Sequence, residues 1–521
     1  MFGIVLAELS ALGVGGSHVQ TLQAPPLRLT GQGVFIGQVE LGRPALWPFD
    51  RLGKSDVQPY AVFFQDGQAL PDRHVETHAL QVAAVAIGNG TRFQGVAPNA
   101  RLIASAYAGR PQDGQPEAAL ALQHVARQQN GRVRAAVLSF GEPLQVPGQP
   151  PDRLDGQSLL TLCVDWLAYT HNLLPIVAGN QRRGGIPIPT DLYNGLVIAA
   201  SRPDAQGVYR YLDRANLIDE PFQDRNGNGR YDPGEPFDDL NRDGQWTPAV
   251  ESPVDGRRTL ALLAPGTHQT LPLPNGRSAT VSGTSFAAPH VLGVVALLHE
   301  YIDRQIAQGR WDERARRADL LQALLLNSAD KMRDRDRLSY REVRDFHERT
   351  WLESDAFRQG EYPFSRHLGA GHLNGTAAWH NLAAGPHPPG PVPPVGWYTE
   401  TLAAAPHTYT LDLGRGTFSA TLVWLRRVDL QDDNGNGRFD PGESFVAHPV
   451  PTLTLELRDA QNQVIARSHS PRDNRQHLFL PTPQPGRYHL VVQGDTAQPY
   501  AIAWWGPRNR YDGADVSPPG L

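Results

Sequence analysis

The stretch GTSFAAPHV at residues 283–291 predicts a serine on the first turn of a buried helix. Gly283 permits a tight turn before Ser285, and Pro289 is tolerated only near a helix start, where an N–H lacks a partner. Residues 291–298 read VLGVVALL and predict the core of that helix. A hydroxyl at the positive end of a helix lies where developing negative charge is stabilised. A lone Gly-Thr-Ser would indicate only a helix cap, but the nine-residue stretch as a whole is far more specific.

The size and charge of the chain narrow the classes of protein it can represent. With 521 residues it is long enough for a large catalytic domain and one further module. Its net charge of −5 gives no strong attraction to nucleic acid, and no apolar run approaches the roughly 18 residues of a membrane span. The single cysteine, Cys163, excludes an internal disulfide framework and lies in an apolar run, which indicates a buried structural thiol. We therefore expect no nucleic-acid or membrane partner.

The pattern of apolar residues divides the chain into segments. After an N-terminal segment, 1–30, short apolar runs alternate with helical patterns over residues 31–385, which is typical of an α/β domain with a parallel sheet. The helical pattern is clear at 316–327, where leucines recur four residues apart. Strands are expected at residues 34–39, 101–105, 135–138, 174–178 and 196–200.

A change of pattern predicts a second domain. Residues 386–396 are rich in proline and indicate a stiff spacer. Over residues 397–521 the apolar residues alternate with polar ones, and Gly-, Asp- and Pro-rich turns separate the runs. This alternation indicates a small antiparallel β-sandwich, of jelly-roll type.

Several stretches resemble one known family. Residues 283–291 closely resemble the nucleophile motif of the subtilisin-like serine proteases. Residues 95–104 (GVAPNARLIA) resemble the strand after that family's central helix, and residues 369–374 (GAGHLN) resemble its closing segment. The resemblance implies a subtilisin-like three-layer α/β domain with a parallel sheet. It also implies a serine endopeptidase that works through an acyl-enzyme, with its acid, base and serine in that chain order.

The resemblance implies that the general base is a histidine upstream of Ser285. Residues 78–84 (HALQVAA) resemble the start of the family's central helix, and the match at 95–104 fixes the register. His78 is therefore preferred to His74, which falls before the helix. Without that downstream match, an ordinary structural histidine would explain the position as well.

The expected acid is a glutamate where the family has an aspartate. Residues 33–42 (GVFIGQVELG) resemble the strand that ends in the catalytic aspartate, and Glu40 occupies its place. Glutamate accepts the same N–H bond from a histidine ring but carries one extra methylene, so the side chain must fold to keep a distance near 2.7–3.0 Å. Asp50 is the alternative orienting carboxylate.

The resemblance also implies an oxyanion donor and a substrate-pairing edge. Residues 175–180 (PIVAGN) resemble the family's strand that ends in Ala-Gly-Asn, which makes Asn180 the side-chain donor beside the Ser285 backbone N–H. Substrate is expected to add as an extended strand, with main-chain bonds giving affinity. The residues implied in substrate binding are Ser139, Phe140, Gly141, Val177, Ala178 and Gly179.

Two nearly identical stretches predict calcium loops. DRNGNGRYDPGE (224–235) lies in an insertion of the α/β domain at about 208–255, and DDNGNGRFDPGE (432–443) lies in the C-terminal domain. Both match the twelve-residue calcium-loop pattern, in which crowded oxygen ligands repel one another until a cation neutralises them. A third loop beginning at Asp239 is incomplete, and solvated Asn-Gly turns are the alternative explanation. The expected ligands are Asp224, Asn226, Asn228, Arg230, Asp232 and Glu235, and Asp432, Asn434, Asn436, Arg438, Asp440 and Glu443, with both arginines contributing backbone carbonyls.

Three hypotheses for the function follow. The first is a calcium-stabilised, monomeric serine endopeptidase that acts on proteins or peptides and is extracellular. The second is a non-catalytic subtilisin-like scaffold, motivated by Glu40 and by the altered helix around His78. An esterase is the third. Residues 1–16 lack a basic region and make a poor secretion signal, so the extracellular location rests on the resemblance and the calcium loops. Only 39 residues precede Glu40, so we expect either a missing leader and propeptide or a chain that folds unaided.

Overall fold

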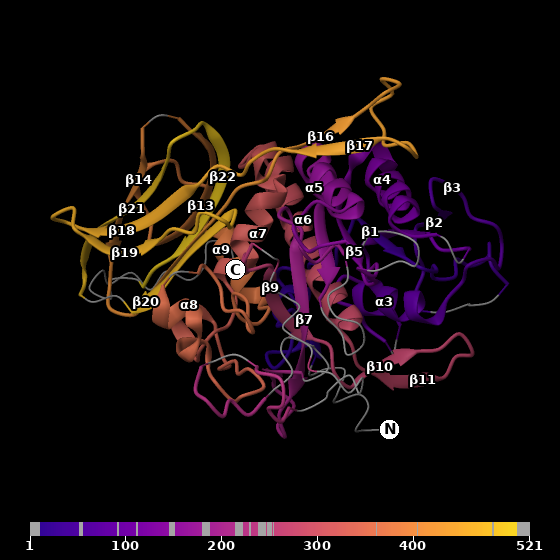
Figure 1. Cartoon of the computed structure of the whole chain (residues 1–521), viewed down its shortest axis with the longest axis horizontal. Coiled ribbons are helices and arrows are strands. Elements are labelled where there is room, and N and C mark those ends of the chain that lie inside the picture. The colour runs from indigo at the N-terminus through magenta and orange to yellow at the C-terminus, as the bar shows by residue number, and fades with distance from the viewer. Residues whose placement is uncertain are drawn as a thin grey trace.

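The computed structural model contains an α/β part and an all-β part that lie side by side (Figure 1). This arrangement agrees with the fold class expected from the sequence. The residues that the structure describes are 11–51, 56–90, 93–110, 113–144, 152–179, 188–213, 222–228, 231–237, 246, 253, 255–360, 362–403, 405–481 and 484–507.

A nine-stranded, mostly parallel sheet forms the middle of the α/β part. Its order is β3-β2-β4-β1-β5-β6-β7-β8, with β9 also pairing with β7, and only β3 and β8 pair antiparallel to their neighbours. The inner strands are covered on both faces, which is why they appear in the sequence as continuous apolar runs. The strands are β1 (Phe35–Glu40), β2 (Ala61–Phe64), β3 (Gly67–Gln68), β4 (Arg101–Ala106), β5 (Val133–Leu138), β6 (Leu174–Ala178), β7 (Leu196–Pro203), β8 (Tyr209–Leu212) and β9 (Leu260–Pro265).

Helices cover both faces of this sheet and give three layers. Helices α4 (Gln115–Gly131) and α5 (Leu159–His171) pack on one face, and Cys163 is buried on α5 as expected. Helix α6 (Thr284–Ala307) crosses the other face, with α3 (Thr77–Ile87) and α7 (Ala318–Asn327) beside it. The remaining elements of the α/β part are α2 (Gln20–Gln23), α8 (Asp355–Gln359), α9 (Gly375–Ala383), the 3-10 helices η1 (Glu313–Arg316), η2 (Arg335–Arg337) and η3 (Trp351–Glu353), and the hairpin β10 (Gln269–Pro272)–β11 (Ser278–Val281).

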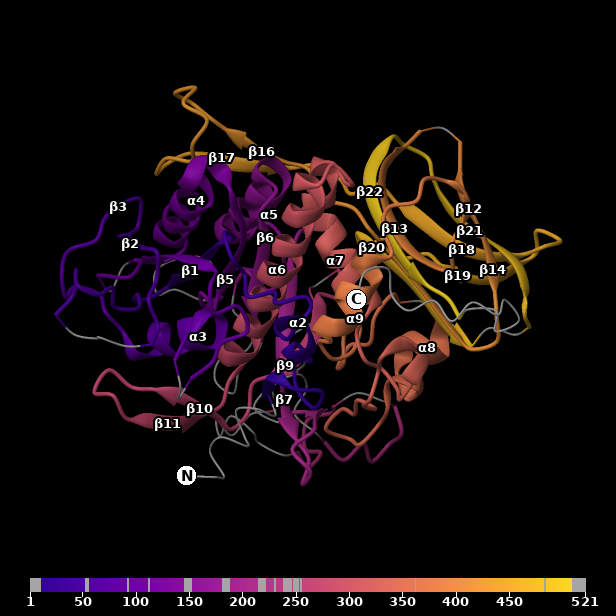
Figure 2. The same cartoon turned by 180° about the vertical axis from the view of Figure 1, so that it is seen from behind.

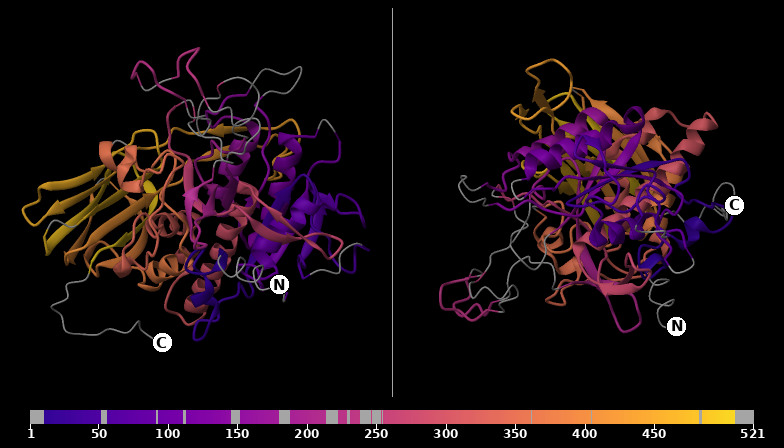
Figure 3. Two further views of the ribbon diagram at one scale, coloured as in Figure 1. Left: turned by 90° about the horizontal axis from the view of Figure 1, so that it is seen from below. Right: turned by 90° about the vertical axis from the view of Figure 1, so that its right-hand side faces the viewer.

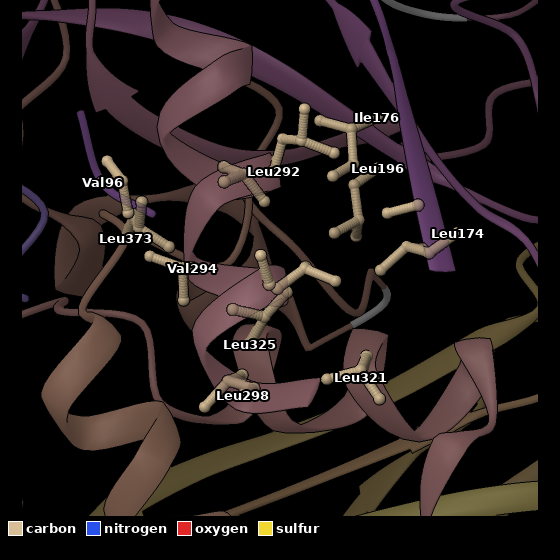
Figure 4. Close-up of a cluster of buried hydrophobic side chains, with 14 of the residues drawn as sticks. Val96, Leu174, Ile176, Leu196, Leu292, Val294, Leu298, Leu321, Leu325 and Leu373 are labelled. Atoms are coloured by element: carbon tan, nitrogen blue, oxygen red, sulfur yellow. The ribbon is translucent and has the colours of Figure 1, made fainter. Parts of the chain in front are cut away.

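Helix α6 is the centre of the larger core. Its leucines and valines contact α7 on one side and strands β6 and β7 on the other (Figure 4). Contrary to the sequence expectation that no run approaches a membrane span, this helix is long and apolar enough to cross a membrane, but 94% of its most apolar window is buried inside the protein. Its composition is therefore explained by the core, which fixes the position of the residues at its N-terminus.

The all-β part contains two facing sheets, seen to one side of the α/β part in Figures 2 and 3. One sheet has the order β12-β14-β21-β18-β19 and the other β13-β22-β15-β20, as expected for a sandwich. The sandwich begins within the proline-rich segment, which supplies β12 and the first residues of β13. The strands are β12 (Gly390–Val392), β13 (Val395–Leu402), β14 (His407–Leu413), β15 (Thr417–Val423), β16 (Val428–Gln431), β17 (Ser444–Ala447), β18 (Leu453–Asp459), β19 (Val464–Ser468), β20 (Arg475–Pro481), β21 (Gly486–Gly494) and β22 (Gln498–Trp505).

Buried polar contacts fix the sandwich on the α/β part. The guanidinium of Arg426, just after β15, donates to the carboxylate of Asp165 on α5 at 2.6 Å, and both side chains are at most 2% exposed. Arg337 donates to Ser419 Oγ on β15 at 2.8 Å. The hairpin β16–β17 reaches away from the sandwich and lies over α4 and α5 (Figures 1 and 2). The two parts are therefore joined across a packed interface as well as through the chain.

Candidate active site

The end of strand β1 brings a carboxylate against the first turn of α3. Glu40 is the last residue of β1 and is 2% exposed, and His78 is the second residue of α3. Nδ1 of His78 lies 2.5 Å from Oε2 of Glu40. A carboxylate in this position fixes the ring orientation and leaves Nε2 free to exchange a proton.

Neither alternative residue takes part in this pair. The carboxylate of Asp50 accepts two hydrogen bonds from the guanidinium of Arg43, at 2.7 and 2.8 Å, and both side chains are fully buried. His74 stacks on the ring of Phe64, with 4.2 Å between centroids. The structure therefore brings Glu40 and His78 together and leaves Asp50 and His74 in other roles.

A second residue holds the longer side chain of Glu40, and sequence reasoning did not find it. Nε2 of Gln38 donates to Oε1 of Glu40 at 2.8 Å and to the carbonyl of Ala79 at 2.9 Å. The signal was present in the sequence, because residues two apart on a strand point to the same face. Gln38 thus ties β1 to the first turn of α3 and sets the distance from Glu40 to His78.

Ser285 lies at the N-terminus of α6, beside this pair. It is the second residue of the helix and is 6% exposed. Its Oγ donates to the carbonyl of Ser139 at 3.2 Å, and Ser139 Oγ donates back to the carbonyl of Ser285 at 3.0 Å. The ring of His78 lies 5.6 Å from the ring of Phe286, the residue after the serine. The base and the nucleophile candidates are therefore neighbours at the edge of the sheet where β1 and β5 end.

The expected substrate-binding segment at the end of β6, residues 177–179, is largely buried. Val177 and Ala178 are 0% and 3% exposed and pair with β7, so their side chains lie in the core and only their backbone could meet a substrate. The carbonyl of Gly179 accepts a hydrogen bond from Thr284 Oγ1 at 2.8 Å, which ties this strand to the serine turn. Asn180, the expected oxyanion donor, lies outside the described residues. On the β5 side, Phe140 is half-buried and Gly141 is exposed.

Burial and hydrogen bonding change the acid–base properties of the pair. Burial raises the pKa of Glu40, and the hydrogen bond from His78 opposes that effect. Burial lowers the pKa of His78, but the hydrogen bond and charge of Glu40, with a smaller contribution from Glu76, outweigh it and raise the pKa above 6.5. His78 is thus a stronger base than an ordinary histidine.

The raised pKa of His78 predicts the acid limb of the pH profile. A histidine that takes a proton from a serine must be neutral, so kcat/KM should fall as the pH decreases through a pKa above 6.5. The measurement is kcat/KM for a peptide substrate from pH 5 to 9. Glu76→Gln should shift the limb to lower pH, because one of the negative charges that raise the pKa is removed. A limb centred below pH 6 in the unmodified protein would contradict the assignment.

The two predicted calcium loops have the same internal hydrogen bonds. In the second loop Asp440 accepts hydrogen bonds from the amides of Asn434 and Asn436 at 2.8 and 2.6 Å, and these bonds lower the pKa of Asp440. Glu443, 8% exposed, accepts from the backbone N–H groups of Asp433 and Asp440. The first loop repeats these contacts with Asn226, Asn228, Asp232 and Glu235. Arg230 and the expected ligands of the third loop lie outside the described residues.

The donor set of these loops fits a hard cation. Within the described parts of the chain, no three His, Cys, Asp or Glu side chains gather as a metal cluster. Each loop instead offers carboxylate, amide and backbone oxygens in turn, as calcium loops do. In the second loop Asp432 faces inward, because its carboxylate accepts from the backbone of Asn436 and Gly437.

Comparisons with known proteins identify the family. Residues 57–356, more than half of the chain, match the model of the subtilase family of peptidases. The matched span includes His78 and Ser285 and begins after Glu40. No curated protein matches the chain.

Solved structures similar to this chain are also proteases. Prenylagaramide maturation protease PagA is 19% identical over 67% of this chain and 92% of its own, with a TM-score of 0.40. A psychrophilic protease is 20% identical over 66% of this chain and 92% of its own, with a TM-score of 0.40. Patellamide maturation protease PatA is 20% identical over 67% and 97%, with a TM-score of 0.39. With a family match over more than half of its length, the chain belongs to the subtilase family and is a serine endopeptidase.

Proposed function

We propose that this protein hydrolyses peptide bonds with Ser285 as nucleophile, His78 as general base and Glu40 as the orienting acid. The observation that carries the proposal is the 2.5 Å contact between Glu40 and His78, beside a serine at a helix N-terminus. The contact also argues against the scaffold hypothesis, because a decayed site has no need to keep this hydrogen bond. The use of glutamate is accommodated by Gln38, which holds the second carboxylate oxygen.

The proposed reaction has two steps. Nε2 of His78 takes the proton from Ser285 Oγ as the oxygen bonds to the substrate carbonyl carbon, and the same proton then passes to the leaving amine. Water enters and His78 takes one of its protons as the hydroxide oxygen bonds to the acyl carbon; His78 then gives this proton to Ser285 Oγ as the ester bond breaks and the acid product leaves. Asn180 and the backbone N–H of Ser285 are the proposed donors to the oxyanion, and the positive end of α6 stabilises the same charge.

The test is labelling with a fluorophosphonate, which reacts with an activated serine. We expect one adduct on the unmodified protein, placed on Ser285 by peptide mass analysis, and none on Ser285→Ala. An unlabelled but folded protein would reject the triad and favour the binding scaffold.

We also propose that residues 224–235 and 432–443 each bind Ca²⁺. The support is the shared loop geometry and the mixed oxygen donors, which suit a hard cation. An ion that binds only the folded state stabilises it by an amount that rises with the logarithm of the free ion concentration relative to Kd. We therefore expect EGTA to lower the Tm by several degrees and excess Ca²⁺, but not excess Mg²⁺, to restore it. A melting curve that chelation leaves unchanged would reject both sites.

A further inference from the structure

The two predicted calcium loops differ at only two of twelve positions, but they lie in different surroundings. Both lie between short pairing segments, Phe222 with Phe237 for the first and β16 with β17 for the second. Glu235 and Glu443, the last residues of the loops, are equally buried at 8% exposed. The difference therefore lies outside the loops, in what each one contacts.

The second loop is docked on helix α4 of the α/β part. The side-chain amide of Gln123 donates to the carbonyl of Phe439 at 3.0 Å and accepts from its N–H at 2.6 Å. Arg127, one turn further along α4, donates to the carbonyl of Gly437 at 2.8 Å. The same few residues of the loop thus face the proposed ion on one side and α4 on the other.

The side chain of Phe439 enters the core of the α/β part. It is 1% exposed and stacks on Phe445 of β17, which in turn contacts Trp166 of α5. The core cluster that contains Phe439 also contains Val39, next to Glu40, and Leu138, next to Ser139. Phe439 therefore belongs to the same packed unit as the strands that carry the active site.

The matching residue of the first loop, Tyr231, does not have this position. It is half-buried and stacks on Trp246 at 4.7 Å, with Phe222 and Phe237 at its edges. All three of these rings come from the same insertion. An ion bound in the first loop would therefore order aromatic residues of the insertion and not the core of the α/β part.

Helix α4 connects the docked loop to the strand of the triad acid. Val125, two residues after Gln123, packs on β1 at Gly37, where a Cβ atom would lie 2.6 Å from the valine side chain. Gly37 is three residues before Glu40. A shift of α4 is therefore passed directly to β1, because close-packed interiors transmit displacement.

We propose that loop 432–443 is a calcium-dependent clasp, in which ion binding fixes Phe439 on α4 and so holds the α/β part in its catalytic arrangement. The proposal rests on the calcium sites proposed above. In this loop the predicted ligands at Arg438 (through its carbonyl) and Asp440 flank Phe439, so the ion sets the backbone that presents the ring and its N–H to Gln123. A cavity of about 520 Å³ lies at the same seam and is lined by residues of α4, His171 and residues 438–440.

The test compares Glu443→Gln with its matched control Glu235→Gln by amide hydrogen exchange of the peptide that covers α4, with and without Ca²⁺. In the unmodified protein and in Glu235→Gln, we expect EGTA to speed exchange in α4 by about tenfold. In Glu443→Gln, α4 should exchange at the fast rate whether or not Ca²⁺ is present. Slow exchange in calcium-loaded Glu443→Gln, or equal behaviour of the two variants, would overturn the clasp.

A third variant separates docking from ion binding. Gln123→Ala removes both hydrogen bonds to Phe439 but no predicted ligand, so calorimetry should still find two Ca²⁺ sites while α4 loses its response to the ion. Calorimetry that finds no Ca²⁺ in the unmodified protein would overturn the calcium sites and the clasp together. Two bound ions without any change in α4 would overturn the clasp alone. Fluorophosphonate labelling of Ser285 in calcium-loaded protein reports on the triad independently of either result.

Discussion

Ser285→Ala is expected to lower kcat by about six orders of magnitude, the size of effect measured for the nucleophile of subtilisin, a member of the same family. Without the hydroxyl, no acyl-enzyme forms, and His78 and the oxyanion donors have no nucleophile to act on. The side chain is 6% exposed at the first turn of α6, and alanine fits there with the loss of one hydroxyl. The fold should therefore be kept.

The measurement is the hydrolysis of a fluorogenic peptide, together with the thermal unfolding of each protein. Ser282→Ala is the matched control, because Ser282 is three residues away and its hydroxyl accepts a hydrogen bond from the N–H of His268 in the neighbouring loop. The control should retain turnover. Turnover of Ser285→Ala within tenfold of the unmodified protein would show that another residue is the nucleophile.

Glu40→Gln is expected to lower kcat by about four orders of magnitude with little change in KM. The amide of glutamine has the size of the carboxylate but cannot stabilise a charged imidazole. It also donates to Nδ1 of His78, which places the ring proton on Nε2, where it blocks removal of the Ser285 proton. Glu40→Asp tests the length of the side chain. The shorter carboxylate falls away from the contact that now measures 2.5 Å, so we expect a loss of more than about tenfold.

Glu76→Gln is the control for these two variants, and kcat and the pH profile are measured for all three. Glu76 lies before α3 and affects His78 only through its charge, so its removal should move the acid limb and keep the plateau. If the maximal kcat fell equally in Glu76→Gln and Glu40→Gln, the nearby negative charge, and not the hydrogen bond from Glu40, would be what makes His78 an effective base.

The sequence predicted the α/β fold and its main strands because their signals are local. Buried parallel strands have continuous apolar runs, and the five predicted runs all fall on strands β1, β4, β5, β6 and β7. The position of Ser285 was also predictable, since the turn, the proline and the apolar helix that place it are consecutive in the chain. The resemblance to the family then gave the chain order of the acid, the base and the serine.

Other features could not be predicted, because they depend on distances between segments far apart in the chain. The resemblance placed Glu40 at the position of the acid but left Asp50 as an alternative partner for the histidine. The buried guanidinium of Arg43, which pairs with Asp50, decides between them. The burial of the Val177 and Ala178 side chains likewise depends on the neighbouring strand and helices of the tertiary structure.

By itself, the sequence determined the fold class, the turn that carries Ser285 and two loops with the same pattern of oxygen donors. Each of these rests on local patterns of neighbouring residues, repeated along the chain in the case of the fold class. Only the tertiary structure removed Asp50 as the alternative partner of His78 and showed that Gln38 holds Glu40 in place. It also decided that one of the two loops, and not the other, has its aromatic residue in the core of the α/β part. The physical reason is that packing joins residues hundreds of positions apart, such as Gln123 and Phe439, and no local pattern in either segment specifies the other.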